Sequence, residues 1–230
     1  MMFTRIWLAA IIALVIFSTS AIGSPSFDDL DEKLAACNLV LKNTIEMPDG
    51  SIPRDLLRRC QAIAIFPRLL KIGFFMGMSS GQGVVLRREP ESGQWSRPVF
   101  FDIKSGSFGP QIGAQRVDLV LLIMTEKGVE SLLEEKFTLG ADISITGGPV
   151  GREASAETNL RLDAAVLSYS RSRGFFMGMS MTGASIEPAK EANRVYHGAG
   201  ISAQDVFFEQ RGVLSDHGKI LIETIKDAAR

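Results

Sequence analysis

Four basic residues occupy two matching positions of the chain, a few residues before two copies of one seven-residue string. The string GFFMGMS occurs at Gly73–Ser79 and again at Gly174–Ser180. The basic residues are Arg68 and Lys71 before the first copy, and Arg171 and Arg173 before the second. Cations beside apolar positions attract an anionic membrane surface, and each contributes about 1 kcal/mol near it. If the two copies lie side by side, we expect all four cations at one lipid-binding edge; the alternative is that they are ordinary solvated charges of turns.

The glycine-rich segments of the chain do not match the loops that hold nucleotides. A P-loop ends in glycine, lysine and then serine or threonine, and no such triplet occurs in the sequence. A dinucleotide fingerprint needs a helix directly after its glycines, whereas a strand is expected after Gly81 and Gly83. The sequence therefore disfavours nucleotide binding.

The other polar candidates favour structural roles over catalysis. His197 and His217 are far apart in sequence, and we expect both on the surface, since a zinc site would need further ligands converging on them. Asp118 lies in an apolar run, where a buried acid needs a partner; Arg116 or Arg152 could form a structural ion pair with it. No serine, histidine and acid lie in the context of an activated nucleophile. We predict a protein that is not an enzyme and holds no metal or cofactor.

The first 23 residues have the layout of a secretory signal peptide. A basic start with Arg5 precedes the apolar run Ile6–Phe17 and the small residues up to Gly23. The run is short for a membrane span, and an uncleaved anchor is the alternative. Its removal takes away one of the 25 basic residues and none of the 26 acidic ones, a balance that disfavours nucleic-acid binding. We expect a mature chain from about Ser24, in the periplasm or secreted.

Helices are predicted at both ends of the mature chain. Ser26 precedes two acids and an apolar pattern of helical spacing that runs to about Glu46. Pro53 suits the first turn of a shorter helix that ends near Cys60. The pattern indicates an N-terminal helical hairpin over residues 24–61 and a C-terminal helix within residues 213–230.

The two cysteines lie on the two arms of this hairpin. Cys37 is twelve residues before Asp49, and Cys60 is eleven residues after it. If the arms are antiparallel, the sulfur atoms lie at similar heights in a compartment that is expected to be oxidising. We therefore predict a Cys37–Cys60 disulfide; the alternative is two buried free thiols.

Between the helices, residues 62–212 alternate mostly with the period of β-strands. The short apolar run Ala62–Phe66 is expected to end at Pro67, and each copy of the repeated string is expected to form one strand. Gly77 and Gly178 would then lie at strand centres, where glycine marks a bulge, a bend or a close backbone approach. The matching surroundings predict an internal pseudo-repeat. The fold class is α+β, with a mostly antiparallel sheet or barrel-like core.

Residues from about Ile52 to Gly212 resemble the SYLF domain family. The matching pieces are Ile52-Pro53, Ala62–Pro67, Gly73-Phe74, Gly81 with Gly83–Val85, Trp95-Ser96 with Pro98, Gln111–Gly113 with Asp118, Phe137–Gly140, Gly148-Pro149 with Gly151-Arg152, and Tyr169-Ser170 with Ser172 and Gly174-Phe175. They follow one another in the family's order over about 160 residues.

This resemblance implies a β-rich domain with helices that binds phospholipids. We therefore expect a non-enzymatic domain that associates with anionic phospholipid surfaces of the cell envelope. The alternative is a structural or protein-interaction module of the envelope that does not bind lipid directly. An envelope protein is a possible partner and nucleic acid is not. Actin binding belongs to yeast members of the family and is not expected for an exported protein.

Overall fold

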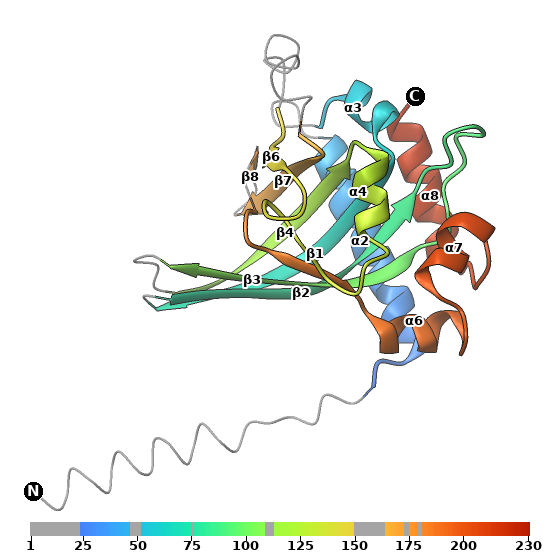
Figure 1. The fold of residues 1–230 in the computed structure, drawn as a ribbon, viewed down its shortest axis with the longest axis horizontal. Coiled ribbons are helices and arrows are strands. Elements are labelled where there is room, and N and C mark those ends of the chain that lie inside the picture. Colours follow the sequence, from blue (N-terminus) through green and yellow to red (C-terminus); the bar gives the residue numbers. More distant parts are fainter. Residues whose placement is uncertain are drawn as a thin grey trace, which may run out of the picture.

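The computed structural model describes residues 24–46, 52–74, 76–108, 113–149, 164–172, 175–178 and 181–230. Within these residues six helices accompany one nine-stranded sheet (Figure 1), so the predicted α+β class is confirmed. The expected signal peptide, Arg152 and Arg173 lie outside the described residues. The helices are α2 (Phe27–Ile45), α3 (Arg54–Arg59), α4 (Glu126–Ser131), α6 (Lys190–His197), α7 (Ala203–Glu209) and α8 (Asp216–Ala228).

The sheet is antiparallel except at one pair of strands. Its strand order is β5-β9-β3-β2-β1-β4-β7-β6, with β8 paired to β7, and only β6 and β7 run parallel among the described strands. The strands are β1 (Ala62–Phe74), β2 (Met76–Arg87), β3 (Val99–Phe108), β4 (Gly113–Ile123), β5 (Phe137–Thr138), β6 (Ile145–Gly147), β7 (Val166–Ser172), β8 (Phe175–Gly178) and β9 (Ser185–Pro188). The four longest strands, β3, β2, β1 and β4, are neighbours in this order and form the middle of the sheet.

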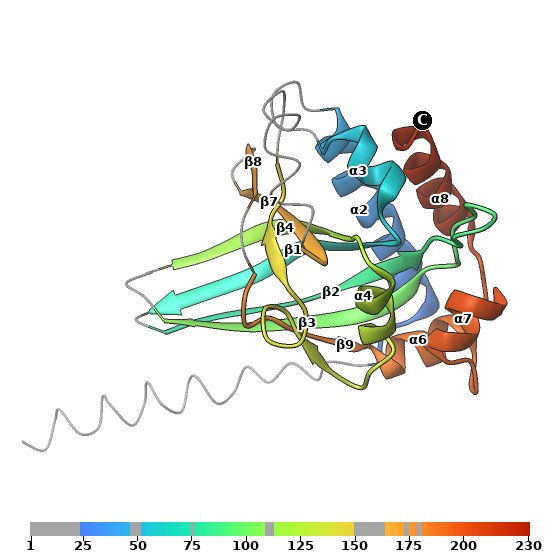
Figure 2. The same cartoon turned by 45° about the horizontal axis from the view of Figure 1, so that its top comes forward.

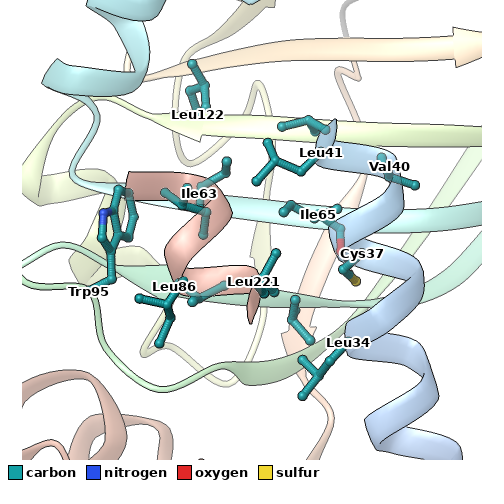
Figure 3. Packing of buried hydrophobic residues seen from close by; sticks show 14 of the residues in the cluster. Leu34, Cys37, Val40, Leu41, Ile63, Ile65, Leu86, Trp95, Leu122 and Leu221 are labelled. Carbon is teal, nitrogen blue, oxygen red and sulfur yellow. Dashed lines mark hydrogen bonds between the residues drawn. The ribbon is translucent and has the colours of Figure 1, made fainter. Parts of the chain in front are cut away.

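One face of the sheet packs against α2 and α8, and we call it the α2 face. Ser26 caps α2 and forms a capping box with Asp29, as the sequence predicts for this helix start. The apolar stripe of α2 then lies on alternate residues of the strands, which include Ile63 and Ile65 of β1. Figure 3 shows Leu34, Cys37, Val40 and Leu41 of α2 directed onto this face, with Leu221 of α8 beside them.

The opposite face packs against α4 and α7, and we call it the α4 face. Its core contains Ala64 and Phe66 of β1, which alternate with the residues of the α2 face as strand geometry requires. Val129 of α4 and Phe207 of α7 cover these residues. The sheet therefore carries an apolar layer on both faces, over the part of its length that the helices cover.

β1 does not end at Pro67, contrary to the prediction. Pairing with β4 is interrupted between Phe66 and Leu69 and then resumes to Gly73. Proline lacks the N–H of a strand ladder, and a bulge is one of the few places where a sheet accepts it. Arg68 has a φ of 52°, and its N–H donates to a carboxylate oxygen of Asp118 in β4 at 2.9 Å. The segment predicted to be a basic connection is thus a bulge within a strand of 13 residues.

The two copies of the repeated string do not form equivalent strands, so that prediction is wrong. The first copy spans the end of β1 and the start of β2, where Gly73 pairs with Gly77 across the hairpin. The second copy contributes β8, which ends at Gly178. Gly77 and Gly178 therefore lie near strand ends, not at strand centres. Both copies do belong to antiparallel hairpins, β1–β2 and β7–β8.

The predicted Cys37–Cys60 disulfide is also wrong, because both cysteines are free and buried. The Cys37 thiol lies under α2 and contacts the carbonyl oxygen of Ile65 at 3.5 Å. Cys60 lies before β1, and its thiol contacts the carbonyl of Leu57 at 3.3 Å. Five residues separate Cys60 from Ile65, which in extended chain is on the order of 15 Å. The second arm leads into the sheet and does not return along α2.

Both thiols are expected to be unreactive in the folded protein. Burial raises the pKa of each to about 12, so almost no thiolate is present at pH 8. An aromatic disulfide reagent should release no colour from native protein. It should release two equivalents after unfolding in guanidinium chloride without a reductant. Unfolded, unreduced protein with no reactive thiol would contradict the structure.

Candidate functional site

The four central strands project beyond the helices, and we call this projecting part of the sheet the strand extension (Figures 1 and 2). It comprises residues 67–74 of β1, 76–82 of β2, 103–108 of β3 and 113–118 of β4. Continuous pairing holds the four strands together, from Gly73 with Gly113 on one side to Met76 with Phe108 on the other. Beyond the bulge at Pro67 and Arg68, the extension is therefore a continuously paired sheet, and no described helix covers its far end.

The strand extension carries an excess of positive charge. Its only acidic residue is Asp118, whereas its basic residues are Arg68, Lys71, Lys104 and Arg116. Arg68, Lys104 and Arg116 are exposed, and Lys71 is half-buried. Lys104 forms an ion pair with Glu187 of β9 at 2.5 Å, while Arg116 has no ion pair with any described residue. A local basic surface thus exists on a chain whose formal net charge is −1.

The α2 face of the extension combines this charge with exposed apolar side chains. Leu70 pairs with Arg116 on β4 and with Ser80 on β2, and it is 42% exposed. Met78, two residues before Ser80 on the same face, is 73% exposed. Among the large apolar residues whose exposure the structure describes, Met78 has the greatest exposure. This face is therefore both basic and apolar.

Asp118 brings two of the predicted lipid-binding residues together. It accepts the N–H of Arg68 from one neighbouring strand and lies in register opposite Arg171 on the other. The predicted convergence of the two basic segments is therefore present for Arg68 and Arg171, on either side of β4. Lys71 lies further along β1, opposite Gln115, and Arg173 is outside the described residues.

A polar chain joins the base of the extension to α2. The Lys33 ammonium donates to the side-chain oxygen of Gln82 at 2.6 Å, and the Gln82 amide donates to Asp102 at 3.0 Å. Burial lowers the pKa of Lys33. These contacts fix the start of α2 on β2 and β3, at the point where the helical cover ends.

The site contains residues that the sequence reading did not assign to it. The sequence pattern indicates Arg116 only as a partner for Asp118 and does not indicate Lys104 or Leu70, whereas Met78 belongs to the repeated string. Their placement depends on the register of β1 with β4 and of β2 with β3, which joins these residues to partners 24 to 46 positions away. The alternating pattern of the sequence indicates that these residues lie in strands, but it does not indicate which strands pair with one another.

The two histidines lie in different surroundings. His197 is 7% exposed, so the expectation of two surface histidines is wrong for this residue. One of its ring nitrogens lies 2.9 Å from the carbonyl oxygen of Pro98, and the other accepts the N–H of Val213 at 3.1 Å. His217 is half-exposed and lies 2.8 Å from Asp31. No group of three potential metal ligands occurs among the described residues.

His197 should make the folded protein sensitive to mild acid. Burial is the main cause that lowers its pKa, and the charge of Arg97 adds to the effect. Because the folded-state pKa is below the unfolded value, the unfolded chain binds the proton more readily. This part of the stability is complete above about pH 6.5 and is lost as the pH falls towards the folded-state pKa.

The measurement is the free energy of unfolding in urea at pH 7, 6 and 5, for the parent and for His197→Gln. The parent should lose up to about 1.4 kcal/mol per pH unit more than the variant, which is the slope for one proton. His217 is present in both proteins, so its contribution cancels. Identical pH profiles would contradict a buried neutral His197.

No described helix combines the length and the apolar character needed to cross a bilayer.

Comparison with known proteins adds a family and relatives. The family model described as "Ysc84: Las17-binding protein actin regulator" matches residues 104–228. The human "SH3 domain-containing YSC84-like protein 1" is 34% identical over 162 residues, which are 70% of this chain and 47% of the human protein. The Saccharomyces cerevisiae "LAS seventeen-binding protein 3" is 35% identical over 170 residues, 73% of this chain and 37% of the yeast protein. The chain matches half or less of the length of these relatives.

The printed names describe binding and regulatory proteins and indicate protein partners for these relatives. Because the family description mentions actin, the comparison gives no support to the expectation that actin is an unlikely partner. That expectation stays a prediction.

Proposed function

We propose, on the premise that the chain belongs to the Ysc84 (SYLF) domain family, that it is a non-enzymatic phospholipid-binding domain. It attaches to anionic membrane surfaces through the strand extension. The observation that carries this proposal is the four basic residues and one acidic residue on a part of the sheet that projects beyond the helices, with Leu70 and Met78 exposed among them. Cations attract the surface, and apolar side chains enter its interfacial layer.

The energetics favour a combined mode of attachment. The three cations of the extension without an ion pair to the described residues contribute about 3 kcal/mol near an anionic surface, which alone corresponds to a dissociation constant of about 6 mM. Burial of Leu70 and Met78 in the interface adds to this, at about 25 cal/mol for each Å² of apolar area removed from water. Electrostatic attraction then selects the membrane, and apolar contact prolongs attachment.

The proposed location is the cell envelope, where the domain would lie on the membrane after export. The first 23 residues support export by their composition. Intact-mass analysis of protein recovered from the envelope tests this part. A mass that begins near Ser24 is expected, and one that retains Met1 would contradict cleavage.

Vesicle flotation at two salt concentrations tests the proposed lipid binding. The purified protein should float with phosphatidylcholine vesicles that contain 30% phosphatidylglycerol and should remain at the bottom with phosphatidylcholine alone. Raising the salt from 0.05 M to 0.5 M should reduce flotation, because salt screens exposed charges. Equal flotation with both vesicle types, or none with either, would contradict the proposal.

Protein binding without lipid is the second candidate. The names of the relatives favour it, and a pocket of about 380 Å³ lies between the C-terminal parts of α2 and α8. Its walls include Ile45, Arg54, Ile220 and Asp227, a mixture of apolar and charged groups that suits a peptide. The same flotation experiment separates the candidates, since binding at this pocket gives no attachment to protein-free vesicles.

A further inference from the structure

A row of polar residues crosses the strand extension on its α4 face. In register across β4, β1, β2 and β3, the row is Gln115, Lys71, Ser79 and Ser105. Each is the direct cross-strand neighbour of the next, so their Cβ atoms are about 5 Å apart. We call these four residues the polar row.

Neighbouring residues establish which face the polar row occupies. Leu69, two positions before Lys71, is buried in the core of the α4 face, and Ile103, two before Ser105, belongs to the same core. A Cβ on Gly81, two after Ser79, would run into the Leu69 side chain. The row therefore continues the α4 face outward, at the point where its apolar core ends.

Lys71 carries a charge that the described structure does not balance. No hydrogen bond or ion pair joins its ammonium group to any residue that the structure describes. Burial of the half-buried side chain lowers its pKa, and no neighbouring carboxylate raises it again. Lys104 on the α2 face differs, since it is exposed and Glu187 balances it. A partly desolvated cation without a partner among the described residues is stabilised by an anionic ligand that pairs with it.

The two serines of the polar row also offer hydrogen-bonding groups. The hydroxyl groups of Ser79 and Ser105 form no hydrogen bond with the described residues. Ser79 is the direct neighbour of Lys71, and Ser105 is the direct neighbour of Ser79. One ammonium group with two hydroxyls on one side is a donor set that suits the oxygens of a phosphate.

We propose that the polar row binds the phosphate of one anionic phospholipid headgroup, with Lys71 as the charged contact and Ser79 and Ser105 as hydroxyl donors. This inference deepens the proposed function and rests on it for the source of the phosphate. Lys71 is three residues from the end of β1 at Phe74, about 10 Å along the strand. A lipid held there has its headgroup beside the row when the tip of the extension enters the interface.

Binding of a soluble lipid tests the site apart from the membrane. Calorimetric titration at constant ionic strength uses dihexanoyl phosphatidylglycerol below its micellar concentration, and inorganic phosphate in a separate arm. Lys71→Met should weaken lipid binding at least tenfold. Lys226→Met removes the same charge from the exposed surface of α8, outside the extension, and should change it less than twofold. Equal losses in the two variants, or no saturable binding by the parent, would overturn the site.

The second arm identifies the source of the phosphate. The parent should bind inorganic phosphate at least tenfold more weakly than the short-chain lipid. If phosphate binds as tightly and Lys71→Met abolishes that binding, the ligand is free phosphate and the assignment to lipid is wrong. If Lys71→Met keeps lipid binding while the parent floats with anionic vesicles, the inference fails and the proposed function stands. If the parent binds the short-chain lipid through Lys71 but does not float with anionic vesicles, the site stands and the proposed attachment to membranes fails.

Two further measurements separate binding from folding. Lys71→Met should melt at the same temperature as the parent or higher, because it removes a partly desolvated charge.

A measurement without any variant uses amine acetylation at pH 8, followed by mass spectrometry. The short-chain lipid should slow acetylation of Lys71 at least fivefold and leave that of the exposed Lys226 on α8 unchanged. Equal rates at Lys71 with and without the lipid would contradict the inference even if the variant unfolds.

Discussion

Removal of three charges from the strand extension is expected to weaken attachment to anionic vesicles by on the order of a hundredfold. The variant is Arg68→Gln, Lys71→Gln and Arg116→Gln in one chain. Each cation contributes about 1 kcal/mol near an anionic surface, so the three together contribute about 3 kcal/mol. Neutral glutamine places no negative charge beside Asp118, which accepts the main-chain N–H of Arg68 in either protein. The melting temperature should change little, since none of the three side chains has an ion pair with the described residues.

A matched control separates local charge from net charge. Lys42→Gln, Lys219→Gln and Lys226→Gln also remove three exposed cations, all from α2 and α8. Cosedimentation with vesicles containing 30% phosphatidylglycerol should give this control an affinity within about threefold of the parent. If the two triple variants lose affinity equally, the attraction belongs to the whole molecule and the extension is not the binding surface.

Gly83→Ala, which adds a single methyl group to the sheet near the site, is expected to lower the free energy of unfolding strongly. A Cβ at this position would lie 2.6 Å from a ring carbon of Phe66 and 2.8 Å from its Cα, and would overlap the carbonyl oxygen of Ile65. Real Cβ atoms do not approach main-chain atoms so closely, and here β1 cannot withdraw without losing its pairing with β4. We expect a loss of about 3 kcal/mol, at the upper end of the range for overpacking. Domains of this kind are stable by only about 5–15 kcal/mol.

Gly106→Ala is the control for this effect. It adds the same methyl group to β3, where no atom lies within 4 Å of the added Cβ. Its stability should equal that of the parent or exceed it by up to about 1 kcal/mol, because alanine restricts the unfolded chain. Urea unfolding followed by tryptophan fluorescence measures both variants. A Gly83→Ala protein as stable as Gly106→Ala would show that the strands are not so closely packed.

The close approach at Gly83 illustrates what the sequence could and could not predict. The repeated string drew attention to Gly77 and Gly178, and glycine in a strand does indicate close packing. Gly83, opposite the bulge at Pro67, is closely packed, and the repeated string did not point to it. That bulge is held by Asp118, about 50 residues away in the chain. A local pattern cannot reveal a contact between segments so far apart.

Local signals were sufficient for the helices at the two ends. Ser26 and its following acids gave the start of α2, and the apolar spacing gave its end within one residue of Ile45.

The hairpin inside the first GFFMGMS copy was not predicted, because the string contains none of the Asn-Gly or Asp-Gly pairs that mark tight turns. The predicted disulfide required the segment that carries Cys60 to run back antiparallel along α2. That return is a tertiary feature without a local signal.

The candidate site shows the same division. The charges at Arg68, Lys71 and Arg171 could be identified in the sequence, whereas Arg116 joins them only through the pairing of β4 with β1. Lys71 was grouped with Arg68, yet strand alternation places it on the face opposite Leu70. The register of the strands alone gives the extension two different faces. The α2 face is basic and apolar, and the α4 face is polar and carries Lys71, whose charge no described residue balances.

An environment-sensitive fluorophore on the extension tests the central claim most directly. Met78→Cys places a thiol at a position that is 73% exposed, and Leu39→Cys places one on α2 at a position that is 60% exposed. The native cysteines are buried, so a nitrobenzoxadiazole label should react only with the added thiol. On addition of anionic vesicles, the label at position 78 should brighten and shift to shorter wavelength, while the label at position 39 should not change. A shift at position 39 with none at position 78 would contradict attachment through the strand extension.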